Sequence, residues 1–570
     1  MILMVCCRKA GSDAIEIKNI RKEGSHMKTF KLFAVLLLTI VMLVTGCNGK
    51  ESNTGTNNES QSDKGASSGA QSEKNNEAQL PEADDFSEKI DLTFAKVAFP
   101  PKENAPVIKK LEELYNINFG YINFERTKEG DLVALKIASG EVPDVFEVVG
   151  NMVEFNQYYK QGILRSIPEE YLKKYAPTVY ETQKKYLKYL KFEGEIYGIC
   201  GERLNNVYPL NAIWRKDWLD RLGIAKVPET LEEAEKAFYA FAKNDPDDNG
   251  KQDTYGLGKS GLDMIFGAYG SIPWGPWEQY WLWQKDDNGQ LIYSAVKPEM
   301  KDALAVLSKW YKDGVIDPEF IVGENKGGYW AVSTDFVNNK IGFTGLAHFY
   351  HWMPPLREGE SGGPVYKELK IANPDAELAY GKPVVGPNGH SGTWQYQVGV
   401  GAAEVIVLSN KVSDKQLIRY LQILENQVTN EDNRMLVEYG IKDVHWEFNK
   451  NGLRVRKADY ENRERYHPEG IQLLNSIYTL ENSRKEHPER YAWGDQHYDF
   501  PGYRSELVAA LPSESKLRPD LDLLRDEYYI SIITGQKPLD DFDKFVKKWY
   551  ELGGDTLTKE ANDWYSNLEQ

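Results

Sequence analysis

The sequence contains little cysteine and no excess of basic side chains. Four Cys in 570 residues are too few for a disulfide-stabilised scaffold. Lys and Arg number 69 against 86 Asp and Glu, which gives a formal net charge of −17. A nucleic-acid-binding protein carries a basic binding face, so the composition argues against that class. The length allows several domains or one large two-lobed body.

Motifs of common catalytic sites are also scarce. Neither His-Glu-x-x-His nor Gly-x4-Gly-Lys-Ser/Thr occurs, so the sequence lacks the zinc-protease and P-loop signatures. Gly-x-Ser-x-Gly occurs at residues 65–69 and 359–363, but without the strand–turn–helix context of a nucleophile elbow. Residues 256–261 fit a dinucleotide-binding spacing, and we interpret them as a turn because no clear helix follows. We assign no catalytic residue and expect the chain not to be an enzyme.

The N-terminal region has the pattern of a secretion signal. Met27 begins a short basic stretch, and an apolar run follows at residues 32–44. Its 13 residues are too few for a membrane-spanning helix of about 20 and are typical of a signal-peptide core. The sequence Val-Thr-Gly-Cys at 44–47 resembles the bacterial lipobox. We therefore predict a lipoprotein signal peptide at 27–46 and a lipid on Cys47; the alternative is a signal anchor with an incidental cysteine.

The segments on either side of this signal are not expected to fold. Residues 1–26 precede a complete signal peptide, and we interpret them as a misassigned upstream start, because residues 22–24 can be encoded by a ribosome-binding sequence. Residues 48–79 contain no Val, Ile, Leu, Met, Phe, Tyr or Trp and cannot bury apolar surface. We therefore predict a disordered tether at 47–86 that holds a folded body, residues 87–570, off the membrane.

The start of this body alternates between two periodicities. Strand-like runs at 90–95, 117–122 and 144–149 are separated by segments with helical apolar spacing. Strands that alternate with helices favour a parallel sheet covered by helices, so the expected fold class is α/β. Further helices are predicted at four places: residues 230–243, 299–313, 414–427 and 538–552.

Six short segments are similar to segments of family 1 extracellular solute-binding proteins. They lie at residues 138–145, 214–219, 222–223, 228–231, 313–320 and 553–555. The resemblance implies a two-lobed, periplasmic-binding-protein-like fold with a hinge and a central ligand cleft. It places an N-lobe at about 87–205 plus 396–475 and a C-lobe at about 206–395 plus 476–570.

The resemblance also implies a function. The expected protein is a monomeric bacterial lipoprotein on the extracellular face of the cell membrane, the substrate-binding component of an ABC importer. Its partners would be an oligosaccharide ligand and the ABC permease subunits in the membrane. The alternative is a cell-surface carbohydrate-active enzyme, a glycosidase or lyase. Such an enzyme needs two opposed carboxylates, which a chain this rich in acids cannot single out.

An acidic loop has the spacing of the first part of an EF-hand. Oxygen-bearing side chains occupy loop positions 1, 3, 5 and 9, with glycine at position 6 and a backbone carbonyl at position 7. The family resemblance implies that positions 9 and 10 complete the site. The predicted ligands of a structural Ca²⁺ are Asp245, Asp247, Asn249, Lys251 through its carbonyl, Asp253 and Thr254. Position 12 is Gly256 instead of a bidentate Glu, and the alternative is an acidic turn without a metal.

Aromatic side chains make up 12% of the sequence, which indicates stacking sites. Trp274 and Trp277 lie in a segment rich in Gly and Pro that can display rings to a ligand, whereas the helical spacing around Trp218 and Trp310 favours the core. The family resemblance adds residues after strand-like segments and near the expected hinge, for which hinge or surface packing is the alternative. The predicted ligand-binding residues are Asn151, Glu202, Arg203, Trp274, Trp277, His348, Trp352, Trp394 and Tyr396. Two histidines at 348–351 lack the partner spacing of a zinc site.

Overall fold

The computed structural model describes residues 80–124, 126–127, 130–149, 152–201, 207–275, 281–321, 334–345, 348–357, 360, 362–396, 404–450, 452 and 454–568. The upstream segment, the signal peptide, Cys47 and most of the tether lie outside these residues. So do four of the predicted ligand-binding residues, Asn151, Glu202, Arg203 and Trp277. Predictions about them stay predictions.

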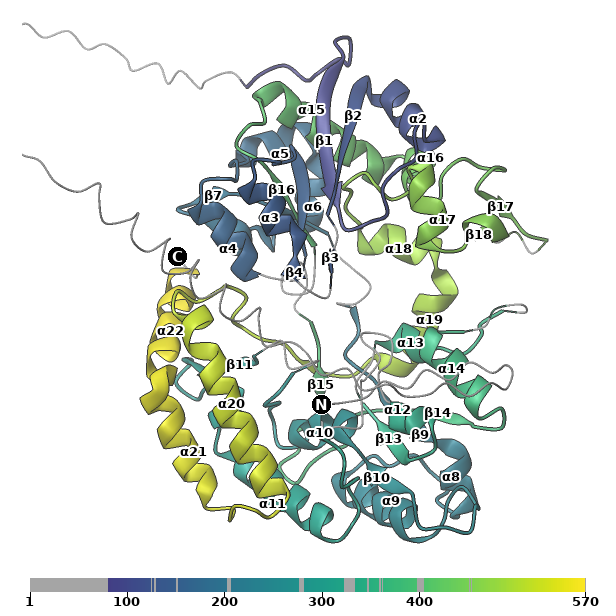
Figure 1. Ribbon diagram of the computed structural model, residues 1–570, viewed down its shortest axis with the longest axis vertical. Helices are drawn as coiled ribbons and strands as arrows, with labels where there is room; N and C mark the ends of the chain where they lie inside the picture. The colour runs from purple at the N-terminus through teal and green to yellow at the C-terminus, as the bar shows by residue number, and fades with distance from the viewer. Residues whose placement is uncertain are drawn as a thin grey trace, which may run out of the picture. The chain divides into compact units, whose positions relative to one another are not determined.

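A five-stranded sheet forms the centre of the first lobe (Figure 1). Its order is β2–β1–β5–β16–β8. β1 pairs in parallel with β2 and β5, whereas β16 runs antiparallel to β5 and β8. The strands are β1 (Ile90–Lys96), β2 (Ile117–Asn123), β5 (Val145–Val149), β8 (Ile199–Cys200) and β16 (Glu404–Leu408). The three strands predicted between residues 90 and 149, and their parallel pairing, are confirmed.

Helices and short hairpins surround this sheet. In helix α15 (Asp414–Thr429) the sequence determines where the helix begins, because Ser413 and Gln416 form a reciprocal capping box at its start. Leu417, Leu421 and Leu424 then bury one face of the helix in the core. The other elements of the lobe are α2 (Pro106–Tyr115), β3 (Arg126–Thr127), β4 (Gly130–Asp131), α3 (Leu132–Ala138), α4 (Met152–Lys160), α5 (Glu169–Tyr175), α6 (Pro177–Gln183), η1 (Leu187–Leu190), β6 (Lys191–Phe192), β7 (Glu195–Ile196), α15 itself (Asp414–Thr429), α16 (Glu431–Glu438), β17 (Trp446–Phe448), β18 (Arg454–Arg456), η4 (Ala458–Tyr460), α17 (Arg463–Tyr466) and η5 (His467–Glu469).

A four-stranded sheet of order β10–β13–β9–β14 forms the second lobe. β10 and β13 are parallel, and β9 runs antiparallel to β13 and β14. The strands are β9 (Ala212–Arg215), β10 (Tyr255–Leu257), β13 (Ile341–Thr344) and β14 (Leu378–Gly381). Trp218 and Trp310 are fully buried in its core, as predicted. Phe238 joins the two sides of that core, because its ring stacks on Trp214 at 5.2 Å and meets Trp310 edge-on at 5.5 Å.

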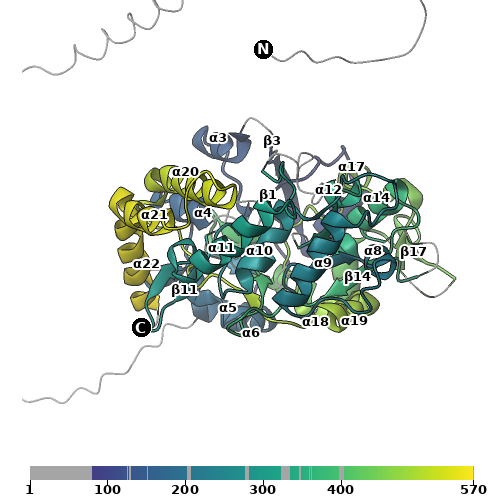
Figure 2. The ribbon, with the colours of Figure 1, turned by 90° about the horizontal axis from the view of Figure 1, so that it is seen from below.

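Helices from distant parts of the chain complete the second lobe. Figures 1 and 2 show α20 beside α21, at the same side of the molecule as α22. The elements are α8 (Lys216–Arg221), α9 (Leu231–Lys243), α10 (Lys259–Gly267), β11 (Trp283–Lys285), β12 (Leu291–Tyr293), η3 (Ser294–Val296), α11 (Glu299–Lys312), α12 (Thr334–Val337), α13 (Phe349–Trp352), α14 (Pro364–Ala372), β15 (Thr393–Trp394), β19 (Gly502–Tyr503), α20 (Glu514–Ile533), α21 (Asp541–Trp549), η6 (Tyr550–Gly554) and α22 (Asp555–Leu568). The four further predicted helices are confirmed as α9, α11, α15 and α21.

The chain passes between the lobes after α18 (Leu480–Glu486). Asn482 on α18 donates to the carbonyl of Val428 in the first lobe. The next helix, α19 (Pro488–Tyr498), contacts α13 of the second lobe. The two-lobed α/β class is therefore confirmed, whereas the exact lobe boundaries stay a prediction. Within the described part of the chain, no helix has both the length and the apolar character that a membrane crossing requires.

One sequence interpretation is wrong. Residues 256–261 were expected to form a turn without a following helix, but α10 begins at Lys259, directly after β10. Eight of the nine residues of α10 are buried. A helix buried on all sides shows no amphipathic period, which is why the pattern did not reveal it. Gly261 permits the close packing, since a Cβ there would lie 2.9 Å from the Phe343 ring.

Candidate functional site

Three segments from distant parts of the chain run side by side in the second lobe: residues 207–211, 393–396 and 501–505. The Leu210 amide donates to the Trp394 carbonyl at 2.8 Å, and the Thr393 hydroxyl donates to the Leu210 carbonyl at 2.6 Å. β15 and β19 pair in parallel, and the Gln395 amide donates to the Tyr503 carbonyl at 2.9 Å. We call this place the junction.

The junction is tight because glycine replaces a side chain where backbones approach. A Cβ at Gly502 would lie 2.5 Å from the Cβ of Gln395, and a Cβ at Gly392 would lie 2.7 Å from the Tyr503 ring. Both distances are far below van der Waals contact. The two glycines therefore fix how closely the segments pack, and with it the direction of the side chains that leave the junction.

Three predicted ligand-binding residues come together beside the junction. The ring of His348 is stacked between Tyr350, at 5.4 Å and 11°, and Tyr396, at 5.3 Å and 24°. Trp394 meets Tyr396 edge-on at 6.2 Å. His348, Trp394 and Tyr396 are thus neighbours, although 46 residues separate the first two in the sequence.

Further rings extend this group, among them Tyr208, Tyr380 and Trp493, which the sequence analysis missed. Phe349 meets Tyr208 edge-on at 4.7 Å and stacks on Trp493 at 6.1 Å, and Tyr380 meets Trp493 at 5.0 Å. The one signal in the sequence is Gly494, beside Trp493: a Cβ there would lie 2.6 Å from the Tyr208 ring. The aromatic cluster, as we use the term, comprises Tyr208, His348, Phe349, Tyr350, Tyr380, Trp394, Tyr396, Trp493 and Tyr498.

Four predicted rings lie in hydrophobic clusters: Trp394 and Tyr396 are 3% and 5% exposed, and Trp352 and Trp274 are buried as well. Trp352 is fully buried and meets Phe336 edge-on at 5.2 Å. Trp274 is 4% exposed, and its indole nitrogen donates to Asp526 at 2.7 Å. Trp274 also packs against Phe266. The predicted role of all four rings as ligand contacts stays a prediction.

His348 of the cluster and the neighbouring His351 are neutral at physiological pH. Burial lowers the pKa of His348 to about 3, with a smaller effect from His351, and burial alone lowers the pKa of His351 to about 3. A neutral imidazole can both donate and accept a hydrogen bond, as a sugar hydroxyl can. No group of three or more His, Cys, Asp or Glu side chains within the described ranges is arranged to hold a metal ion.

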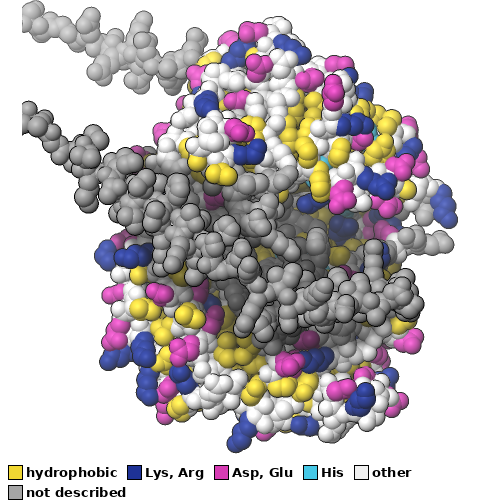
Figure 3. All heavy atoms as spheres, viewed as in Figure 1, with side chains coloured by type: hydrophobic (Ala, Val, Ile, Leu, Met, Phe, Trp, Pro, Cys, Tyr) yellow, Lys and Arg dark blue, Asp and Glu magenta, His cyan; other side chains and the backbone are white. Residues whose placement is uncertain are grey.

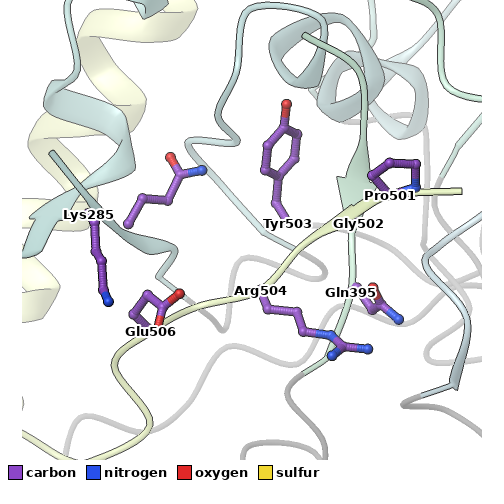
Figure 4. Close-up of a pocket in the computed structure, with 8 residues that line it drawn as sticks. Lys285, Gln395, Pro501, Gly502, Tyr503, Arg504 and Glu506 are labelled. Atoms are coloured by element: carbon purple, nitrogen blue, oxygen red, sulfur yellow. The ribbon is translucent and has the colours of Figure 1, made fainter. Parts of the chain in front are cut away.

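A pocket of about 550 Å³ lies beside β15 and β19 (Figure 4). Its walls include Gln284, Lys285, Gln395, Tyr503, Arg504 and Glu506. Successive side chains of an extended segment point to opposite sides, which explains why Gln395 faces the pocket while Trp394 and Tyr396 join the aromatic cluster. Figure 4 likewise shows Tyr503 and Arg504 leaving the chain in opposite directions. The pocket offers amide, guanidinium, ammonium and carboxylate groups, a set suited to a ligand with many hydroxyls or a charge.

The predicted calcium loop is held by its own hydrogen bonds. The backbone amides of Asn249 and Gly250 donate to the two carboxylate oxygens of Asp245 at 3.1 and 2.9 Å. The Asn249 side chain donates to Asp247 at 2.9 Å and Asp253 at 3.1 Å, so these two carboxylates share one amide. Burial raises the pKa of Asp247, as do Asp245 and Asp253.

The fold matches solved structures of two-lobed solute-binding proteins. The alginate-binding protein AlgQ2, solved without calcium ion, superimposes with a TM-score of 0.57 at 18% identity, over 84% of this chain and 98% of that one. FusA of S. pneumoniae in complex with kestose gives a TM-score of 0.56 at 15% identity, over 84% of this chain and 99% of that one.

Sequence comparison finds a family model and two long relatives. Residues 107–355 match the family model for bacterial extracellular solute-binding proteins. The polygalacturonan/rhamnogalacturonan-binding protein YtcQ of Bacillus subtilis (strain 168) is 25% identical over 512 residues, which cover 84% of this chain and 92% of YtcQ. Lipoprotein LipO of the same organism is 24% identical over 500 residues, 82% of this chain and 90% of LipO.

Proposed function

We propose that this chain is the lipid-anchored, extracellular substrate-binding component of an ABC importer and that it captures an oligosaccharide between its two lobes. The observation that carries the proposal is the junction, which places the polar pocket beside an aromatic cluster whose rings Tyr350, Tyr380 and Trp493 are half-buried. Sugars use both surfaces, because their C–H faces pack on aromatic rings and their hydroxyls hydrogen-bond with planar polar groups.

The names of similar proteins support this ligand class. YtcQ is named for binding polygalacturonan and rhamnogalacturonan, AlgQ2 for binding alginate, and FusA was solved with kestose. All of these ligands are built from sugar units. The name of LipO and the lipobox-like sequence at Cys47 together support a lipid anchor.

Binding by lobe closure follows from the position of the junction. Val508, three residues beyond it, is buried in a first-lobe cluster with Phe146 and Leu190, and Trp564 of α22 stacks on Tyr189 of η1 at 6.4 Å. A ligand held here can contact both lobes. It shifts the protein toward the closed arrangement only as far as it binds that arrangement more tightly, and the permease would recognise the closed state.

The acidic loop is proposed to hold a structural calcium ion. The donor set is oxygen-rich, as hard cations require, and Oδ1 of Asp247 is buried without a hydrogen-bond partner. Asp245, Asp247, Asn249 and Asp253 would supply the side-chain oxygens, and Lys251 its carbonyl. Thr254 is less suited, because it is buried and its hydroxyl donates to the Phe241 carbonyl at 2.8 Å. The ion would neutralise repulsion among the three carboxylates.

The deciding experiment is calorimetric titration of the purified protein with neutral and acidic oligosaccharides, followed by analysis of the sugar for breakdown products. Binding of intact sugar supports the proposal. Cleaved sugar would replace it with the enzyme alternative, and a panel without any binding would refute the ligand class.

A pair of matched tyrosine variants tests whether the aromatic cluster is the binding surface. Tyr350 and Tyr311 are both half-buried. Tyr350 stacks on His348, whereas Tyr311, which lies on α11, packs against Phe320. Tyr350→Ala should weaken sugar binding roughly tenfold, and Tyr311→Ala should leave it unchanged. Equal affinities in the two variants would exclude the cluster as the ligand surface.

A further inference from the structure

The pocket beside β15 and β19 has the opposite charge balance to the whole chain. Two cations, Lys285 and Arg504, and one anion, Glu506, line it, while the chain carries a formal net charge of −17. Figure 3 shows Lys and Arg interspersed with Asp and Glu over the described surface of both lobes. At physiological ionic strength, charges beyond about 8 Å are largely screened. A ligand in the pocket therefore senses the local cations rather than the net charge.

The amide and hydroxyl groups of the pocket bond to the scaffold, including the Gln395 amide, which donates to the Val207 carbonyl at 3.0 Å. The oxygen of the Gln284 amide accepts from Ser271 at 2.6 Å and from Lys297 at 3.4 Å, and its nitrogen donates to Gly270 at 3.2 Å. The hydroxyl of Tyr503 donates to the Gly267 carbonyl at 2.8 Å. The ammonium of Lys285 lies 4.8 Å over the Tyr565 ring, and the ionic side chains of the lining give the pocket its positive charge.

Arg504 lies where it can contact a ligand that also contacts both lobes. Its side chain is exposed, so a ligand can reach it. The surrounding protein lowers the pKa of the guanidinium by removing water, and the phenol of Tyr186 has the opposite effect. Tyr186 lies between α6 and η1 of the first lobe. Val508, four residues beyond Arg504, is buried in a first-lobe cluster, so Arg504 lies near both lobes. A guanidinium matches the geometry of a carboxylate.

We propose that this pocket is the subsite for a sugar unit that carries a carboxylate, with Arg504 and Lys285 as its cationic contacts. The ligand would then be a uronic-acid-containing oligosaccharide. This inference rests on the proposed function, since it names the class of sugar bound. Glu506 would accept hydrogen bonds from the hydroxyls of the same unit, and repel a carboxylate in the reversed orientation.

The test compares three trisaccharides by calorimetric titration: trigalacturonate, its methyl ester, and neutral galactotriose. The unmodified protein should bind the acid at least tenfold more tightly than the ester, and the difference should shrink between 50 and 300 mM salt. Arg504→Gln should weaken binding of the acid roughly ten- to hundredfold, the range of a charge-assisted hydrogen bond, and leave the ester within a few-fold. Arg465→Gln is the control, because it changes the net charge equally at an exposed first-lobe side chain.

The outcomes separate this inference from the proposed function. If acid, ester and neutral sugar bind equally well, or Arg504→Gln weakens all of them alike, the carboxylate subsite is refuted while sugar binding stands. If none of the three and no other sugar binds, the proposed function fails. Lys285→Gln, on the β11–β12 hairpin, gives a second reading if Arg504→Gln does not fold: it should weaken the acid and spare the ester.

Discussion

The charge network around Arg525 supports the segment that carries Trp274 and Trp281. The guanidinium is 1% exposed and contacts Asp522 and Asp526, each at 2.9 Å. These carboxylates also accept hydrogen bonds from the indole nitrogens of Trp281 and Trp274, each at 2.7 Å. Both indoles are therefore held to α20 through carboxylates that Arg525 neutralises.

Replacing Arg525 by Met keeps the apolar bulk and removes the charge. Loss of one partner from a buried ion pair costs about 3–5 kcal/mol, because the other partner is left uncompensated. Here Asp522 and Asp526 are 25% and 29% exposed, so water can solvate them in part. We therefore expect the lower end, a loss of about 3 kcal/mol in the free energy of unfolding of the second lobe.

The matched control is Arg518→Met, two turns earlier on α20. The Arg518 side chain is 22% exposed and pairs with Glu514 at 2.7 Å and Asp522 at 3.3 Å, so it should contribute no more than about 1 kcal/mol. Urea unfolding followed by tryptophan fluorescence measures both variants. Equal losses in the two variants would show that the buried network does not stabilise the lobe.

Three further changes have defined outcomes. Burial raises the pKa of Asp263 to about 7, above its unfolded value of about 3.9. The folded state therefore binds more protons than the unfolded state, and its stability falls as the pH rises from about 4 to 7. Asp263→Asn should remove this fall, so the melting temperature of the variant should depend less on pH over that range. Gly502→Ala places a Cβ 2.5 Å from that of Gln395 and should cost about 1–3 kcal/mol of unfolding free energy as well as ligand affinity. Calcium should raise the melting temperature, and Asp245→Asn should abolish the rise; an equal rise in both proteins would place calcium elsewhere.

Local patterns predicted the elements of this protein well. α9 begins where Thr230 and Glu233 form a capping box, and its buried residues follow the helical period. The residues that form such signals lie close together in the chain, so a single sequence is enough to recognise them. α10 shows the limit, because a helix buried on all sides has no polar face and no period to detect.

The candidate site was harder to predict because tertiary packing assembles it. His348 and Tyr396 were named from family resemblance, but their stacking depends on α13 and the junction meeting in space. Tyr208 and Trp493 lie 285 residues apart, and no local pattern connects them. Arg504 and Lys285 were missed for the same reason: an isolated cation in a sequence is typical of a solvated surface, and only the fold brings the two to one pocket.

The same extended stretch serves both candidate binding surfaces, so they are mechanically linked. Trp394 and Tyr396 belong to the aromatic cluster, and Gln395 between them belongs to the pocket. On the pocket side Gln395 is packed against Gly502 with no room for a further carbon; on the other side Tyr396 is stacked on His348. A displacement of either surface must therefore move the other. A ligand that contacts both surfaces should bind more tightly than one that contacts either alone, because only the larger ligand stabilises the whole junction. A ligand shifts the protein between its arrangements only if it binds one of them more tightly than the other.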